Sequence, residues 1–181
     1  MTSRVMYSCG ISLDGFIAGP AGDMQWMRPY MGGPSQAGDS LMKQTGSLLI
    51  GHRTFHGDDP NRGTDQEGAF SGQWQGQMFV LTHHPPTEPV PDVTFVTDLE
   101  NGVALAREAA GGRYVSVLGA DVARQCIGAG LLDEILVMVV PVLLGDGTRL
   151  FDWPGGHSVD LVQRESTTAP GETALWYDVR R

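Results

Sequence analysis

Four short segments hold the residue types that could bind a ligand, and each one is near the end of an apolar run of strand length. They span residues 12–19, 51–54, 82–84 and 119–123. Ligands of α/β proteins bind outside the carboxyl ends of parallel strands, where the following loops meet. The four segments therefore predict one site, and their joint occurrence suits a dinucleotide that lies across a sheet edge.

Two of these segments have the composition of phosphate-binding helix starts. Gly51, Arg53 and Thr54 offer close backbone approach, a guanidinium and a hydroxyl at the start of a predicted helix. Gly119 lets backbone amides approach a pyrophosphate at a second helix start. An ordinary surface arginine and an ordinary helix-start glycine are the alternatives. The second helix start continues through Ala120, Asp121, Val122 and Ala123.

The other two segments could contact the remaining parts of such a ligand. Thr82 and His83 place a hydroxyl and an imidazole where a ribose phosphate could bind, but a turn before Pro85 would have the same composition. In the first segment, Asp14 could orient or protonate a substrate. The alternative for Asp14 is a turn carboxylate that accepts hydrogen bonds from its own loop.

The bulk composition excludes several classes of protein. The chain has 181 residues, 41% of them hydrophobic and 18% charged, which predicts one folded domain over residues 1–181. Its net charge of −9 argues against binding to nucleic acid or to an anionic membrane. Cys9 and Cys126 lie far apart in apolar surroundings, and we recognise no signal peptide or membrane span. We therefore expect a cytoplasmic protein with a small-molecule ligand.

Several ligand motifs are absent from the sequence. There is no GxGxxG after the first strand, no GxxxxGK[ST] and no GxSxG. His52 and His56 have the i, i+4 spacing of a helical metal pair, but Gly57 to Pro60 would end any helix at once. The sequence therefore predicts no metal site, and its ligand edge differs from the usual Rossmann and P-loop types.

Hydrophobic periodicity predicts strands that alternate with helices. Strands are expected at 5–11, 47–51, 78–82, 93–96, 114–118, 135–142, 159–168 and 173–180. Helices are expected at 39–45, 99–110 and 120–129. This pattern predicts an α/β fold with a mixed, mostly parallel sheet flanked by helices and a C-terminal antiparallel hairpin. The loops at 19–38 and 56–77 are long enough to be functional.

The order of motifs along the chain resembles that of the dihydrofolate reductase-like superfamily. The resemblance rests on Ser-Leu-Asp-Gly-x-Ile-Ala at 12–18, Leu-Ile-Gly-x-Arg-Thr-Phe at 49–55 and Val-Leu-Thr at 80–82. It continues through Gly119, Gly-Leu-Leu-Asp-Glu at 130–134 and Pro-Val-Leu-Leu-Gly-x-Gly-x-x-Leu-Phe at 141–151. Within the superfamily the chain is most similar to the RibD C-terminal group, the reductase half of the bacterial bifunctional deaminase-reductase.

This resemblance implies an NAD(P)H-dependent reductase that transfers hydride to a small heteroaromatic substrate of pterin or pyrimidine type. NADPH would lie in an extended pose, with its nicotinamide against Ile17 and Ala18 and its phosphates against the segments at 51–54, 82–83 and 119–123. The 19–34 and 56–77 loops would form the substrate wall, and the resemblance also suggests a homodimer. The pocket residues would be Phe16, Trp26 and Phe55, and the candidate catalytic residues would be Asp14 and Asp39.

Departures from the family pattern keep other interpretations open. A basic residue usually stands at the position of Phe16, so an apolar or aromatic substrate is favoured over a phosphorylated one. His83 replaces another basic residue, so NADH is not excluded as the cofactor. Asp39 lies about one helical turn from the family's substrate-binding acid, and Ala120 replaces a second glycine. The substitutions at positions 16, 83 and 120 favour the alternative of a non-catalytic nucleotide-binding or regulatory module. The zinc deaminase signature is absent, so only a reductase-type domain is expected.

Overall fold

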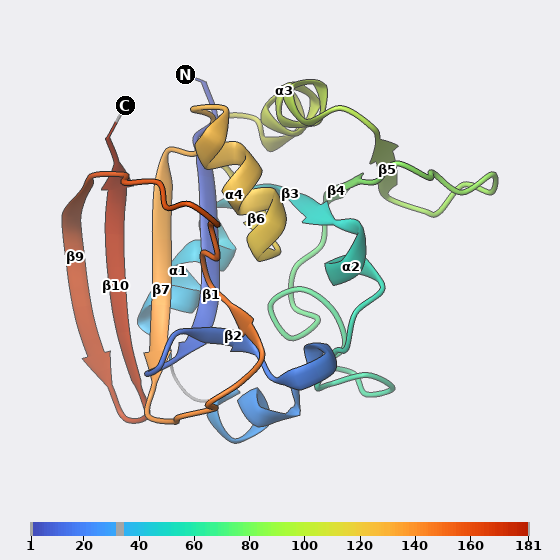
Figure 1. The fold of residues 1–181 in the computed structure, drawn as a ribbon. Coiled ribbons are helices and arrows are strands. Elements are labelled where there is room, and N and C mark those ends of the chain that lie inside the picture. The colour runs from blue at the N-terminus through green and yellow to red at the C-terminus, as the bar shows by residue number, and fades with distance from the viewer. Residues whose placement is uncertain (1, 32–34, 181) are drawn as a thin grey trace.

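The chain folds around one eight-stranded sheet with the strand order β5-β4-β3-β6-β1-β7-β10-β9. The computed structural model describes residues 2–31 and 35–180, and Figure 1 shows their arrangement. The bounds of these strands are β1 Val5–Ser12, β3 Thr45–Gly51, β4 Gln77–Leu81, β5 Val93–Val96, β6 Tyr114–Leu118, β7 Glu134–Val140, β9 Leu161–Ala169 and β10 Glu172–Val179.

The sheet is parallel from β5 to β7 and antiparallel at its C-terminal edge. Each neighbouring pair from β5 through β4, β3, β6 and β1 to β7 is parallel. β10 pairs antiparallel with β7 and with β9. The predicted mixed sheet with a C-terminal hairpin is confirmed. As a consequence, the carboxyl ends of the six parallel strands lie at the same edge of the sheet.

Helices cover both faces of the sheet (Figure 1). α3 (Leu99–Ala110) and α4 (Ala120–Gly128) pack on one face through small and branched residues such as Val103 and Ala123. α1 (Gln36–Gln44) packs on the other face through Ala37 and Leu41. α2 (His52–Phe55) is a single turn that follows β3. None of the described helices is long and apolar enough to cross a membrane.

α1 begins three residues before the start that the sequence predicted. Ser35 caps it, because its Oγ accepts the backbone N–H of Gly38 at 3.1 Å. The same hydroxyl donates to Glu172 Oε1 at 2.7 Å, which ties the start of α1 to β10. The cap lies next to residues 32–34 of the predicted 19–38 loop, which are outside the described residues.

A small second sheet was not predicted. β2 (Phe16–Ala18) pairs antiparallel with β8 (Thr148–Arg149). Strands of two or three residues have no measurable periodicity, so only the folded chain brings them together. Two short 3₁₀ helices, η1 (Pro20–Gly22) and η2 (Gln25–Tyr30), follow β2 in the predicted 19–38 loop.

A buried carboxylate joins the strands at the opposite edge of the sheet. Glu134, at the start of β7, is fully buried and accepts Trp176 Nε1–H at 2.6 Å and the Tyr114 hydroxyl at 3.1 Å. It also pairs with Arg4 at 2.8 Å and with Arg164 at 2.5 Å. A buried charge needs partners of this kind, since an unpaired one is strongly destabilising. A bulge in β9 leaves Arg164 without a direct cross-strand partner in β10 and turns its side chain to this carboxylate.

Candidate functional site

The ends of β3 and β6 meet closely enough that glycine is required. Ile50 and Leu118 are direct neighbours in the ladder, and Gly51 and Gly119 follow them. Gly119 has a φ of +105°, and a Cβ there would lie 2.5 Å from Thr54 Oγ1. The structure therefore brings the 51–54 and 119–123 segments together, as predicted for one shared site.

The start of α4 offers backbone donors at this edge. No side chain caps the helix, and the first N–H with an intrahelical partner is that of Ala123, bonded to Gly119 O at 3.1 Å. The N–H groups of Ala120, Asp121 and Val122 precede it, and such groups together with the helix dipole favour an anion. The side chains of Val122 and Ala123 are buried, so these residues could contribute only their backbone.

The charged side chains beside the start of α4 include one arginine, Arg53, that could contact a phosphate. Arg53 and Thr54 are exposed on α2. Asp121 is paired with Arg124 at 2.6 Å and accepts Gln125 Nε2–H at 2.8 Å. The hydrogen bond from Arg124 is the main reason why the pKa of Asp121 is lowered, with a smaller contribution from the charge of Arg53. Because Arg124 compensates the charge of Asp121, the guanidinium of Arg53 could donate hydrogen bonds to a phosphate.

The segment after β4 contains a turn. The Thr82 side chain is buried, and its Oγ1 accepts the backbone N–H of His84 at 3.1 Å. His83 is exposed. The hydroxyl of Thr82 therefore has the turn role that the sequence offered as its alternative, whereas the imidazole of His83 faces solvent near the same edge of the sheet.

Asp14 is held by hydrogen bonds in the loop after β1. Its carboxylate accepts the Ser12 hydroxyl at 2.6 Å and the backbone N–H groups of Gly145 at 2.7 Å and Leu144 at 3.1 Å. These bonds, the one from Ser12 foremost, lower the pKa of Asp14 to about 2. A carboxyl group with that pKa is a poor proton donor at neutral pH. The geometry gives Asp14 the turn role, and it supports β2, which contains Ile17 and Ala18.

The three aromatic residues predicted for a substrate pocket lie in different surroundings. Phe16 is only 4% exposed, and the Arg149 guanidinium covers its ring at 4.5 Å from the centroid. Phe55 packs edge-on against Phe95, with 5.9 Å between the ring centroids. Trp26 is half-buried, and its Nε1–H is buried without an acceptor. Phe16 therefore belongs to the core, Phe55 packs against β5, and Trp26 has a buried N–H with no acceptor among the described residues.

Asp39 lies in the first turn of α1 at an exposed position. An acidic residue there is stabilised by the helix dipole and needs no other partner. Its position therefore gives Asp39 no feature that separates it from an ordinary surface carboxylate.

His52 and His56 are neighbours with 4.6 Å between their ring centroids, and both are exposed.

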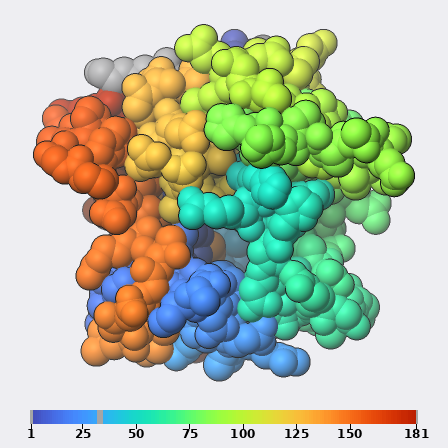
Figure 2. Space-filling view, turned by 45° about the vertical axis from the view of Figure 1, so that its right-hand side comes forward, coloured from blue at the N-terminus to red at the C-terminus, as the bar shows by residue number. Residues whose placement is uncertain are grey.

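The 19–31 loop and the loop that follows α2 lie on two sides of a hollow in the surface. Figure 2 shows the surface hollowed between the blue segment after β1, the teal segment around α2, the gold α4 and the orange segment before β9. In the first loop, Met27 packs so tightly on Gly10 of β1 that any Cβ on Gly10 would overlap its methyl group. Asp58, in the second loop, accepts hydrogen bonds from the first. Neither Met27 nor Asp58 was predicted, because both contacts depend on loops that have no periodic signal.

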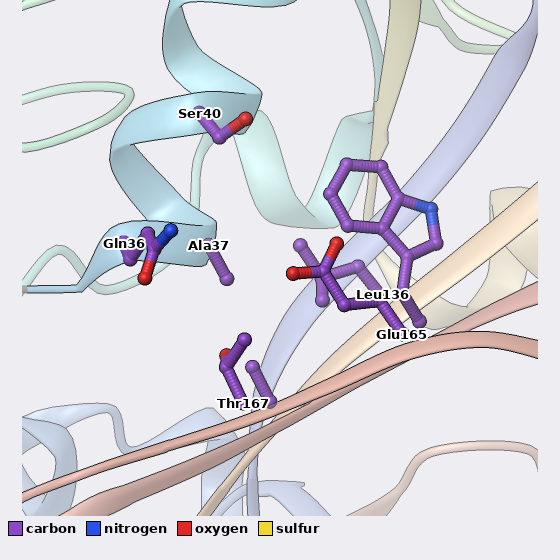
Figure 3. Close-up of a pocket in the computed structure, with 8 residues that line it drawn as sticks. Gln36, Ala37, Ser40, Leu136, Glu165 and Thr167 are labelled. Atoms are coloured by element: carbon purple, nitrogen blue, oxygen red, sulfur yellow. The ribbon is translucent and has the colours of Figure 1, made fainter.

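A separate hollow of about 170 Å³ lies beside α1, over β7, β9 and β10. Figure 3 shows Gln36 and Ser40 of α1 on one side, facing Glu165 and Thr167 of β9. None of the predicted site residues lines it. The hollow is therefore distinct from the cleft at the carboxyl edge of the sheet.

Comparisons with known proteins agree with this architecture. The family model described as the RibD C-terminal domain matches residues 3–175. Protein YwjB of Bacillus subtilis (strain 168), described as uncharacterized, is 22% identical over 155 residues, which are 83% of this chain and 84% of that protein.

Solved structures are similar over almost the whole chain. A protein from Shewanella sp. PV-4 is 23% identical, with a TM-score of 0.75 and full coverage of both chains. The riboflavin biosynthesis reductase Rib7 of Saccharomyces cerevisiae is 16% identical, with a TM-score of 0.65 over 99% of this chain and 90% of that one. Dihydrofolate reductase from Enterococcus faecalis, complexed with NADP(H), is 17% identical, with a TM-score of 0.62 and full coverage of both chains.

At these identities the structural matches establish the fold, which is that of dihydrofolate reductase-like proteins. The family match covers all the parallel strands, both helices of the first face and most of the C-terminal hairpin. By its sequence and by its fold, this chain belongs to the RibD C-terminal domain family.

Proposed function

We propose that this protein is an NAD(P)H-dependent reductase that transfers hydride to a small heteroaromatic substrate of pterin or pyrimidine type. The observation that carries the proposal is the close approach of Gly119 to Thr54 beside the uncapped start of α4. That arrangement offers backbone donors and a hydroxyl where a pyrophosphate would need them. The reductases among the relatives support the same activity.

Each part of the cofactor would meet a different segment of the edge. Arg53 and Thr54 would bind phosphate, with the N–H groups at 120–122. Thr82 and His83 would lie near the adenosine end, and Ile17 and Ala18 would contact the nicotinamide through their backbone. The nicotinamide supplies the hydride, while the protein orients it and excludes water. Within this scheme Asp14 supports the edge and does not donate the proton.

Trp26 indicates what the substrate side of the cleft would recognise. Its indole N–H is buried, and no residue of the described ranges 2–31 and 35–180 accepts it, which costs free energy until an acceptor is supplied. A carbonyl oxygen or a ring nitrogen, as in a pterin or a pyrimidine, is an acceptor of the right kind. This unsatisfied donor supports the proposed substrate class.

A cofactor titration tests the proposal. Purified protein is titrated with NADPH and separately with NADH, and binding is followed by nicotinamide fluorescence. We expect saturable binding of NADPH, and the ratio of the two dissociation constants measures the contribution of the 2′-phosphate. Absence of binding by both cofactors at millimolar concentration would refute the reductase assignment.

The second candidate is a non-catalytic nucleotide-binding or regulatory module on the same scaffold. It is favoured by the states of the two predicted acids, because Asp14 is tied in a turn and Asp39 is an exposed helix-start carboxylate. Under this alternative the protein binds the cofactor tightly but oxidises no NADPH with pterin, pyrimidine or quinone acceptors. Turnover with any of these acceptors would exclude it.

The proposal also includes a cytoplasmic homodimer. β9 is an edge strand whose Leu161 and Val162 are 43% and 40% exposed, and exposed edges of this kind favour association. Size-exclusion chromatography with light scattering should give twice the mass of the chain. A monomeric mass at micromolar concentration would exclude a stable dimer.

A further inference from the structure

Asp58 connects two loops that come from opposite sides of the cleft. One is the loop of residues 19–31, which follows β2, and the other begins directly after α2. Asp58 Oδ2 accepts the backbone N–H of Met24 at 3.2 Å and Gln25 Nε2–H at 3.1 Å. These two hydrogen bonds span more than 30 positions in sequence and join the 19–31 loop to the segment that follows the predicted phosphate helix.

Each loop also contains hydrogen bonds within itself. In the 19–31 loop, Asp23 Oδ1 accepts the N–H of Gln25 at 2.9 Å, and Asp23 O accepts the N–H of Gly19 at 2.8 Å. In the loop after α2, Asp59 accepts the N–H groups of Asn61 and Gly68, both at 2.8 Å. Asp58 therefore acts between two preformed loops, whereas its neighbour Asp59 acts within one.

The residues next to the Asp58 hydrogen bonds explain why breaking these bonds would affect the cleft. Trp26 and Met27 follow Gln25 directly, and Met27 packs on Gly10 of β1. Asp58 lies only a few residues after Arg53 and Thr54. A bond between these segments links the wall on the nicotinamide side to the helix on the phosphate side. Both bonds are exposed to solvent, so they could open without disturbing the core.

We propose that Asp58 is a positioning residue, a latch that holds the 19–31 loop closed over the cofactor edge and limits the rate at which NADPH leaves. The part that concerns NADPH rests on the proposed function. A single oxygen accepts both bonds, so the amide oxygen of Asn can replace it, whereas Ala cannot. This difference separates the latch from any general effect of the loop.

Amide hydrogen exchange of the ligand-free protein tests the two bonds directly. We expect Asp58→Ala to speed exchange of the Met24 N–H on the order of tenfold, the effect of losing a typical hydrogen bond. Asp58→Asn should keep the wild-type rate. Asp59→Ala is the matched control, because it removes bonds within its own loop and should leave Met24 unchanged. An unchanged Met24 rate in Asp58→Ala would overturn the latch whether or not a cofactor binds.

Stopped-flow release of NADPH tests the consequence. We expect Asp58→Ala to raise the dissociation rate on the order of tenfold, with little change in association, and Asp58→Asn to restore it. Gln25→Ala removes one donor, so it should have a smaller effect and add nothing in the Asp58→Ala background. Equal dissociation rates in wild type and Asp58→Ala would overturn the proposal. No NADPH binding by wild type would overturn the proposed function and the cofactor part, while Met24 exchange would still decide the latch.

Discussion

The carboxylate of Asp14 accepts the backbone N–H of Gly145 at 2.7 Å, and this bond joins the loop after β1 to the loop after β7. Leu144 N–H and the Ser12 hydroxyl bind the same carboxylate. Leu150 N–H also bonds to Gly15 O at 3.1 Å. The edge proposed for the nicotinamide is therefore supported by a turn more than a hundred residues away in sequence.

The pH dependence of stability should show the role of Asp14. Its pKa is about 2 in the folded protein, below the ordinary 3.8, so the stability it contributes is present above the ordinary pKa and is lost as the pH falls toward 2. Asp14→Asn keeps an oxygen acceptor but removes the charge. Its melting temperature should lie below that of wild type at about pH 6, and the gap should close as the pH falls below about 4. A gap of constant size between the two melting temperatures would contradict the role of Asp14.

Gly119→Ala should lose cofactor binding, whereas Gly111→Ala should not. Gly119 and Gly111 both have positive φ, so Ala at either position costs about 1–3 kcal/mol of stability. Only at Gly119 would the new methyl group collide, with the Oγ1 of Thr54; nothing lies within 4 Å of a Cβ on Gly111. Urea unfolding and NADPH titration of both variants check this. Equal NADPH affinity in the two variants would remove Gly119 from the site.

Arg53→Ala should weaken NADPH binding by about tenfold or more, because a charge-assisted hydrogen bond to phosphate is worth about 1.5–3 kcal/mol. The loss should shrink at high salt, since the site is exposed. Arg62→Ala is the control. Arg62 is also exposed, but it donates to the carbonyl of Gly57 within the loop that follows α2. A similar loss of affinity in both variants would indicate a general effect of positive charge and not a phosphate contact.

Glu134→Gln should lower the free energy of unfolding by about 1.5–3 kcal/mol, because the carboxamide has only one oxygen to accept from Trp176, Tyr114, Arg4 and Arg164. Arg4 and Arg164 are partly exposed and keep Asp178 as a partner, which limits the loss. Glu165→Gln is a matched control one residue from Arg164, at an exposed position, and should change stability by less than about 0.5 kcal/mol. Urea unfolding of the three proteins measures both values. A much smaller loss of unfolding free energy in Glu134→Gln would mean that the cost of desolvating the Glu134 carboxylate already cancels the energy of its ion pairs.

Trp26→Phe and Trp74→Phe should have opposite effects on the ligand-free protein. Trp26 Nε1–H is buried with no acceptor in the part of the chain that the structure describes, so its removal should be neutral or stabilising by about 1–3 kcal/mol. Trp74 Nε1–H donates to Thr45 O at 3.2 Å, so its removal should cost about 1 kcal/mol. Thermal unfolding compares them. A destabilised Trp26→Phe would show that this indole N–H already has an acceptor, such as a bound water.

The strands, the long helices and the glycines at which these elements end could be predicted, because their sequence signals are local. Residues 114–118 form a strand that ends just before Gly119. Leu99–Ala110 form the helix that their apolar spacing predicted. The terminal hairpin followed from two strand-like segments around Pro170 and Gly171. Short-range spacing determines which face of an element is apolar, and burial of those faces determines the layers.

The contacts that shape the site could not be predicted, because they join residues that local patterns do not relate. Asp14 looks equally like an acid or a turn residue until Gly145, 131 positions away, supplies its donor. Phe16 looks like a pocket residue until Arg149 covers it, and Asp58 looks like a loop residue until Met24 and Gln25 reach it. Residue type and spacing predicted which chemical groups lie at the sheet edge; the packing of distant loops determines which of these groups are already bonded and which are available to a ligand, because each hydrogen-bond partner comes from a different part of the chain.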